Sequence, residues 1–194
     1  MKIEKGFIIL FFLGNVSSFS QVLDTIKGKL FYSKEFYKNF NYLSVKESSS
    51  NTYVRLNESG EFKLVPEEPK KEYELTFYYL DNVFKKYSYK NEWIKRTRFK
   101  SISLAENCNS NKKTAYSEFK NKKLKLYVLE ENKNDKKLEI QNIKKEYSLE
   151  YIYFKEIKLF DCYLEYNKQI LKILTLKYGR EILNRIDKDV IGLE

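Results

Sequence analysis

The stretch Thr52-Tyr53-Val54-Arg55-Leu56-Asn57-Glu58-Ser59-Gly60-Glu61-Phe62-Lys63-Leu64-Val65 has the pattern of two strands joined by a turn. Its first and last five residues follow a period of two, which is typical of strands with one buried face. Between them stand four residues, 57–60, that are common in turns. The last of these, Gly60, adopts a positive φ at little cost. The stretch therefore predicts a β-hairpin.

Further strands are expected on both sides of this hairpin. In Glu72–Tyr79, alternate residues from Tyr73 to Tyr79 share one face. The other expected strands are Thr25–Leu30, Tyr42–Lys46, Phe84–Tyr89 and Trp93–Leu104. About seven short strands at intervals near ten residues predict an antiparallel β-sandwich. Trp93 is expected to be a packing aromatic rather than a platform for a ligand.

The order of four segments carries a family resemblance. The segments are Ile26–Leu30, Asn51–Val54, Asn57–Leu64 and Tyr73–Phe77. Together they resemble the carboxypeptidase regulatory-like domain, a small transthyretin-like β-sandwich that is frequent in exported proteins of Bacteroidota. The resemblance implies an accessory module rather than a peptidase, so no catalytic residue carries over. Residues 31–41 depart from the family because they are rich in aromatics and lysine where it has a shorter loop with glycine.

After Cys108 the pattern becomes mixed. Strands are expected over 122–129 and 148–155, and short helices over 138–147 and 181–186. The clearest helix begins near Phe160 and ends before Gly179, with apolar residues at three- and four-residue spacing and Asp161 as its expected amino-terminal cap. Residues 107–113 are polar and are expected to form a linker or loop. The predicted fold class is thus α+β: the sandwich, then a small α/β segment that ends in an amphipathic helix.

The expected organisation is a signal peptide over 1–20, the sandwich over 22–106 and the α+β region over 107–194. In the last region, four short segments resemble the tail of small exported flavobacterial proteins. They are Cys162, Tyr166–Lys168, Lys177–Gly179 and Asp189–Leu193. This second resemblance implies lineage and export, and it implies no activity.

The first residues have the layout of a secretory signal. Lys2 and Lys5 precede the apolar run Phe7–Leu13, and Ser18 and Ser20 place small side chains before Gln21. Seven apolar residues span only about 10 Å as a helix, against a hydrocarbon core of about 30 Å. An uncleaved anchor is the alternative. We expect an exported protein, periplasmic or secreted, with no stable transmembrane anchor.

Export changes the interpretation of Cys108 and Cys162, the two cysteines of the chain. An oxidising compartment favours a disulfide between them. On the chain-entropy model, a loop of about 55 residues would contribute roughly 4 kcal/mol. The alternatives are two independent thiols or a catalytic thiol, and the last would need a base other than histidine because the chain has none.

Composition weighs against several kinds of enzyme. Without histidine there is no serine triad and no histidine-based zinc site, and the six glycines form no phosphate-binding loop, so neither a metal nor a cofactor is expected. The carboxylate pairs Glu67-Glu68 and Glu130-Glu131 are expected on the solvated surface. A net charge of +10 favours anionic partners, although scattered lysines also serve solubility.

We therefore expect a noncatalytic, exported binding or interaction protein of the bacterial envelope. Its expected partners are a protein or an acidic glycan, and export weighs against nucleic acid. A carboxylate-dependent secreted hydrolase is the alternative, because two distant carboxylates can meet in space.

Overall fold

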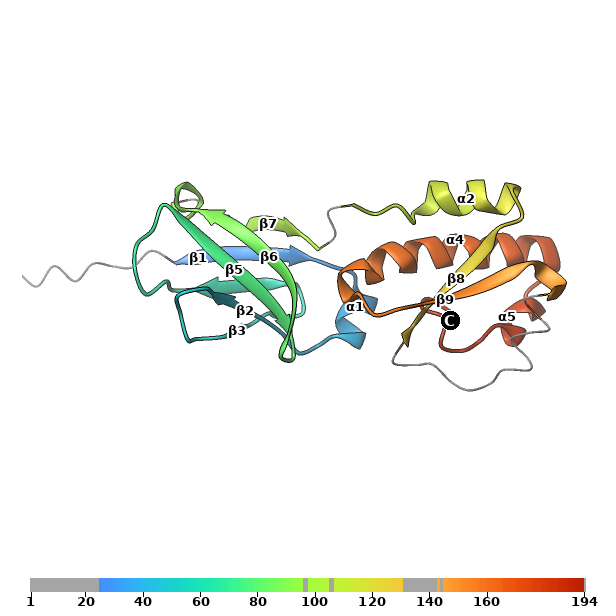
Figure 1. Cartoon of the computed structure of the whole chain (residues 1–194), viewed down its shortest axis with the longest axis horizontal. Helices are drawn as coiled ribbons and strands as arrows, with labels where there is room; N and C mark the ends of the chain where they lie inside the picture. Colours follow the sequence, from blue (N-terminus) through green and yellow to red (C-terminus); the bar gives the residue numbers. More distant parts are fainter. Residues whose placement is uncertain (1–24, 96–97, 105–106, 131–142, 144, 194) are drawn as a thin grey trace, which may run out of the picture.

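The computed structural model describes residues 25–95, 98–104, 107–130, 143 and 145–193. The expected signal peptide lies outside this part of the chain. The molecule is elongated, with the amino-terminal strands at one end and the carboxyl-terminal helices and strands at the other (Figure 1). It is a mixed α/β fold with mostly antiparallel pairing in its amino-terminal sheets and a long helix near its carboxyl end.

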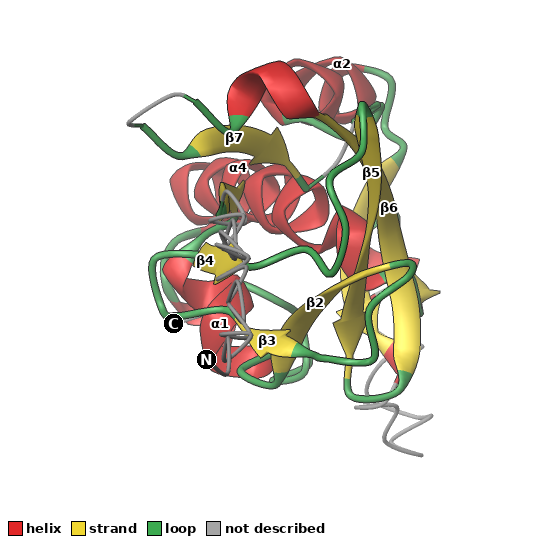
Figure 2. Cartoon of the chain, turned by 90° about the vertical axis from the view of Figure 1, so that its left-hand side faces the viewer, coloured by secondary structure: helices red, strands yellow, loops and turns green. Residues whose placement is uncertain are grey.

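The amino-terminal strands form two sheets. The first has the order β4-β1-β7, and the second has the order β3-β2-β5-β6. The strands of the first are β1 (Ile26–Phe31), β4 (Glu61–Leu64) and β7 (Lys100–Ser103). Those of the second are β2 (Leu43–Glu47), β3 (Val54–Arg55), β5 (Glu72–Tyr79) and β6 (Asn82–Lys90). Viewed from the end of the molecule, β5 and β6 lie on one side, and β4 and β7 on the other (Figure 2).

The core between these sheets follows from the period of two. Phe62 from one sheet meets Phe77 from the other, with ring centroids 5.6 Å apart and nearly perpendicular planes. Phe62 also covers Gly28, its cross-strand partner, where a Cβ atom would lie 2.2 Å from the Phe62 ring. A glycine at this position therefore lets the aromatic ring lie flat on the strand.

The predicted hairpin over 52–65 is wrong. The turn exists: Gly60 has a φ of 81° and its N–H donates to the carbonyl of Asn57. However, β3 before the turn pairs with β2, whereas β4 after it pairs with β1 in the other sheet. The turn thus carries the chain across the core, because each flanking run finds a longer partner strand than its neighbour in sequence.

The purely antiparallel sandwich also needs correction. β1 and β7 run parallel, with Gly28 opposite Lys100 and Phe31 opposite Ser103. The expected strand over 93–104 shortens to β7, and the 3-10 helix η1 (Asn91–Trp93) takes its first residue. A parallel pair requires a long crossover, and here residues 32–99, including β2 to β6, separate the two strands.

The carboxyl-terminal part is a small sheet on a helix. β8 (Leu124–Leu129) and β9 (Leu149–Phe154) run parallel, as their expected ranges allow. α4 (Phe160–Tyr178) ends at Gly179, as its pattern predicts, and the short α5 (Glu181–Arg185) follows. Tyr127 of β8 stacks on Tyr163 of α4 with ring centroids 3.9 Å apart. Of the helix expected over 138–147, residues 143 and 145–147 are described and helical, and the rest lies outside the described residues.

Two helices were not expected. α1 (Lys34–Asn39) follows β1, and α2 (Lys112–Lys120) packs along α4 (Figure 1). The amino-terminal caps account for both. Ser33 accepts from the N–H of Phe36, and Asn111 accepts from the N–H groups of Lys113 and Thr114.

Candidate functional site

The junction between the amino-terminal sheets and α4 positions the candidate site. The Asp161 carboxylate accepts the Ser33 backbone N–H at 2.8 Å and the Ser33 hydroxyl at 2.5 Å. Beside them, Lys168 pairs with Glu35 at 3.2 Å. The ring of Phe160 meets the edges of two rings of the first helix region, Phe36 and Phe40. α1 is therefore fixed to the start of α4 by polar and aromatic contacts.

Asp161 does not cap α4 as expected. The cap position is Leu159, which makes no side-chain capping bond, and Asp161 lies in the first turn. Burial raises the pKa of the Asp161 carboxyl, although the hydrogen bonds from Ser33 oppose this change. The carboxylate thus joins two parts of the chain instead of closing its own helix.

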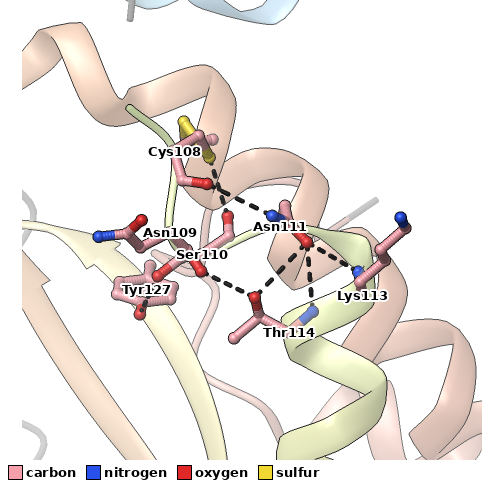
Figure 3. Close-up of a disulfide and its surroundings, with 8 residues drawn as sticks. Cys108, Asn109, Ser110, Asn111, Lys113, Thr114 and Tyr127 are labelled. Atoms are coloured by element: carbon pink, nitrogen blue, oxygen red, sulfur yellow. Dashed lines mark hydrogen bonds between the residues drawn. A yellow bond between two sulfur atoms is a disulfide. The ribbon is translucent and has the colours of Figure 1, made fainter. Parts of the chain in front are cut away.

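Cys108 and Cys162 lie at disulfide distance, with their Cα atoms 5.8 Å apart. Figure 3 shows this pair beside the cap of α2, where Asn111 receives its two backbone donors. Ser110 lies 2.8 Å from the hydroxyl of Tyr127 on β8. The segment before α2 is therefore held both to the first turn of α4 and to the small sheet.

A groove lies where the two parts of the molecule meet. It consists of two adjoining hollows of about 450 and 410 Å³, a size within the range of ligand sites. Phe84, Glu156 and Lys158 line both hollows. One wall comes from β6 and the end of β5, and the other from the segment between β9 and α4. Leu104 and Asn107 complete the first hollow.

The two hollows differ in chemistry. The second is more apolar and is lined by Tyr79, Ile157 and two side chains that are more than half exposed, Leu80 at 54% and Val83 at 51%. The first is polar and basic, with Lys85 and Lys86 on one wall and Lys158 on the other. An apolar hollow beside a cationic one suits a ligand that carries both apolar and acidic groups.

Four lysines and one carboxylate, Glu156, are among the described residues that line the groove. Three of the lysines also form ion pairs with glutamates whose side chains are between 36% and 62% exposed. The pairs are Lys86–Glu74 at 3.2 Å, Lys155–Glu130 at 3.3 Å and Lys158–Glu156 at 3.6 Å. Exposed pairs of this kind contribute little stability. Their ammonium groups can therefore turn to an incoming carboxylate at small cost.

A second polar cluster lies at the carboxyl end of β2, around Glu47. Glu47, only 1% exposed, accepts from the N–H and hydroxyl of Ser49 and pairs with Lys70 at 3.2 Å. Burial raises the pKa of the Glu47 carboxyl, but these hydrogen bonds outweigh burial and lower it. Because the carboxylate stays ionised and holds Lys70, the ammonium of Lys70 is engaged as an ion-pair partner. The cluster closes the turn after β2.

Of the four carboxylates expected on the surface, three lie within the described residues. Glu67 and Glu68 are exposed beside the loop of Asn51, whose N–H donates to Glu67. Glu130 pairs with Lys155, and Glu131 lies outside the described residues. In the described part of the chain, no three acidic or cysteine side chains gather as metal ligands would.

Sequence reasoning missed most of the groove. The expected strands contain several of its lining residues, among them Tyr79, Phe84, Leu104 and Lys155, but the sequence did not indicate that these segments meet. Trp93, expected to be a packing aromatic, is half-buried against Tyr89 with the ammonium of Lys100 3.9 Å from its ring centre. One sequence feature could have indicated the groove. The apolar residues Leu80 and Val83 flank the polar residues Asp81 and Asn82, and an exposed turn between two strands does not need apolar side chains at these positions.

Comparison of the chain with models of known protein families, with curated proteins and with solved structures finds no match. Within the described ranges, none of the helices has the length and apolar character needed to cross a bilayer.

Proposed function

We propose that this chain is a noncatalytic, exported binding protein of the bacterial envelope, and that the groove between β6 and the segment before α4 holds its ligand. The carboxypeptidase regulatory-like resemblance and a transthyretin-like arrangement of the two sheets belong to this proposal. A module of that kind serves attachment or recognition rather than chemistry.

The groove is the observation that carries the proposal. It combines Phe84, Leu80 and Val83 with a cationic rim; one wall is the strand β6, and the other is the short segment 155–159 between β9 and α4. Binding residues are effective when a rigid scaffold holds them. The Ser33–Asp161 hydrogen bonds and the Cys108–Cys162 pair fix the two parts of the molecule on which these walls stand.

Two observations support export. The residues Lys2 to Ser20 have the order of a secretory signal, and the two cysteines lie where they can form a disulfide, a bond typical of oxidising compartments. Fractionation followed by amino-terminal sequencing tests the location. We expect the protein outside the cytoplasm and beginning at Gln21. Cytoplasmic protein that still begins at Met1 would contradict export.

Binding to two polyanions of different chemistry, polyglutamate and polygalacturonate, tests the ligand site. We expect the unmodified protein to bind at least one of them and Lys158→Glu to weaken that binding severalfold. Lys63→Glu is the matched control because the substitution makes the same change in net charge. Lys63 is exposed on β4 and does not line the groove. No binding to either polymer, or an equal loss in both variants, would contradict the groove as the site.

A further inference from the structure

The outer face of the sheet β3-β2-β5-β6 carries exposed tyrosines. Its inner face packs through Phe77 against the sheet β4-β1-β7 on the other side of the core (Figure 2). Because successive side chains of a strand point to opposite faces, Tyr78 in β5 points outward, as do Tyr42, directly before β2, and Tyr53, directly before β3. Tyr42 and Tyr53 are 58% and 54% exposed. Exposed aromatic surface that gathers on one face marks an interaction site.

The strand register brings two of these rings together over a small residue. Ser44 in β2 is the cross-strand partner of both Arg55 in β3 and Tyr78 in β5. Because the Ser44 side chain is short, the rings of Tyr53 and Tyr78 meet across β2, with centroids 5.1 Å apart and an interplanar angle of 70°. The rings therefore form a raised platform on the open surface of the sheet.

Cations stand beside the rings. The ammonium of Lys46 lies 5.2 Å from the ring centre of Tyr53, and the guanidinium of Arg55 lies 5.1 Å from that of Tyr42. Neither cation forms an ion pair with a carboxylate of the described residues. Cation–ring contacts at exposed sites are weak, so both cations can turn to the acidic group of a ligand.

We propose that this tyrosine face, made of Tyr42, Tyr53 and Tyr78 with Lys46 and Arg55, is a second binding surface, and that its ligand is an acidic polysaccharide. A tyrosine offers an apolar ring and a hydroxyl, and a sugar ring likewise has an apolar C–H face and hydroxyls at its edge. The carboxylates of uronic acid sugars would meet the two cations. From Tyr42 to Lys46 the face extends about 13 Å along β2, at about 3.3 Å per residue, which accommodates a short run of sugar rings.

The tyrosine face is separate from the groove, whose lining contains none of its five residues. Its form favours a polysaccharide over a protein, because a protein partner usually anchors a side chain in a closed pocket, whereas these rings stand above the short side chains of Ser44 and Thr76. Single-stranded nucleic acid also stacks on exposed rings beside cations. The choice of a polysaccharide over nucleic acid rests on the export that is part of the proposed function.

Calorimetric titration with two short oligomers of equal charge tests the proposal. One is made of galacturonic acid, which has both sugar rings and carboxylates, and the other of glutamate, which has carboxylates alone. We expect Tyr53→Ala to weaken binding of the galacturonic acid oligomer about tenfold and to leave binding of the glutamate oligomer within about twofold. The variant is made both in the unmodified chain and in the Lys158→Glu chain, so that binding in the groove does not hide its effect.

Tyr116→Ala is the matched control. Tyr116 in α2 is 53% exposed and has the ammonium of Lys120 4.7 Å from its ring centre, but it lies on a different element. A second pair of variants tests the charge: Lys46→Glu should weaken the galacturonic acid oligomer severalfold more than Lys63→Glu does. Circular dichroism verifies the fold of each variant.

Equal effects of Tyr53→Ala and Tyr116→Ala, or no binding of the galacturonic acid oligomer, would overturn the inference. A thymidine oligomer that binds more tightly and is equally sensitive to Tyr53→Ala would overturn the ligand class. If binding of either oligomer depends on Lys158 and not on Tyr53, the inference fails and the groove stands. If binding depends on Tyr53 and Lys158→Glu changes neither oligomer, the groove fails and the tyrosine face stands.

Discussion

The carboxylate of Asp161 in α4 accepts both the backbone N–H and the hydroxyl of Ser33, a residue 128 positions earlier in the chain. The same hydroxyl oxygen accepts from the N–H of Phe36 and so caps α1. One carboxylate thus orders the cap of α1 and attaches that helix to α4. This arrangement joins the amino-terminal part of the chain to the start of α4, the helix that directly follows the groove segment 155–159.

Replacement of Asp161 by Ala is expected to lower the free energy of unfolding by about 2 kcal/mol. It removes two hydrogen bonds and leaves the partly buried N–H of Ser33 without its acceptor. Urea denaturation measures the change. Glu165→Ala is the control, because Glu165 is exposed on the same helix. Equal stability of Asp161→Ala and the control would show that the contact contributes nothing.

The same carboxyl predicts a pH dependence with a definite sign. Burial raises the folded-state pKa of Asp161 above its ordinary value of 3.8, so the folded protein holds this proton more tightly than the unfolded chain. Its contribution to stability is present below that ordinary value and is lost as the pH rises through the folded-state pKa. Relative to Asp161→Asn, which does not titrate, the unmodified protein should therefore lose stability as the pH rises from below 3.8 through the raised folded-state pKa. A change of opposite sign would mean that the contacts from Ser33 dominate over burial.

The cysteine pair makes the third prediction. Non-reducing peptide mapping should give one species that joins the peptides of Cys108 and Cys162, which are 54 residues apart. The double variant Cys108→Ser/Cys162→Ser should unfold at a free energy lower by about 2–4 kcal/mol, because the unfolded chain regains the freedom of that loop. Reduced unmodified protein should match the variant. Native protein whose two thiols both react with an alkylating reagent would contradict the bond.

The strands and α4 could be predicted because apolar residues repeat at a fixed interval within each of them. Glu72–Tyr79 and Phe160–Tyr178 have the bounds that their periods indicate. How strands pair is a different matter. The turn that ends at Gly60 has the residues of a hairpin turn, yet β3 and β4 separate into two sheets. Turn residues specify a local bend, whereas the long partners β1 and β2 decide which sheet each run joins.

The candidate groove could not be predicted because its walls come from distant segments. Phe84 and Lys158 are 74 positions apart, and both line each hollow. Asp161 shows the same limit. A carboxylate in the first turn of a helix is the usual sign of a cap, and only the fold reveals Ser33 as its donor. Local sequence holds no information about a partner that tertiary packing brings into contact.

The last prediction concerns the buried amide of Asn167. Its Oδ1 atom accepts the N–H of Tyr127 at 2.8 Å, and its Nδ2 atom donates to the carbonyls of Tyr127 and Ile191 at 2.8 and 3.0 Å. The side chain is fully buried, so no water replaces it. Its hydrogen bonds satisfy the backbone of Tyr127 on the edge of β8 that faces away from β9, and they attach the carboxyl-terminal segment at Ile191 to that edge.

Asn167→Ala should therefore lower the free energy of unfolding by about 3 kcal/mol or more, because the N–H of Tyr127 would remain buried without an acceptor. Asn167→Asp should be at least as damaging, because it places a charge in the core and removes both donated bonds. Lys172→Ala, at an exposed position of α4, is the matched control. Faster amide exchange at Tyr127 in Asn167→Ala would locate the loss at β8. If urea denaturation shows Asn167→Ala as stable as the control, the amide does not hold the carboxyl-terminal segment to the sheet.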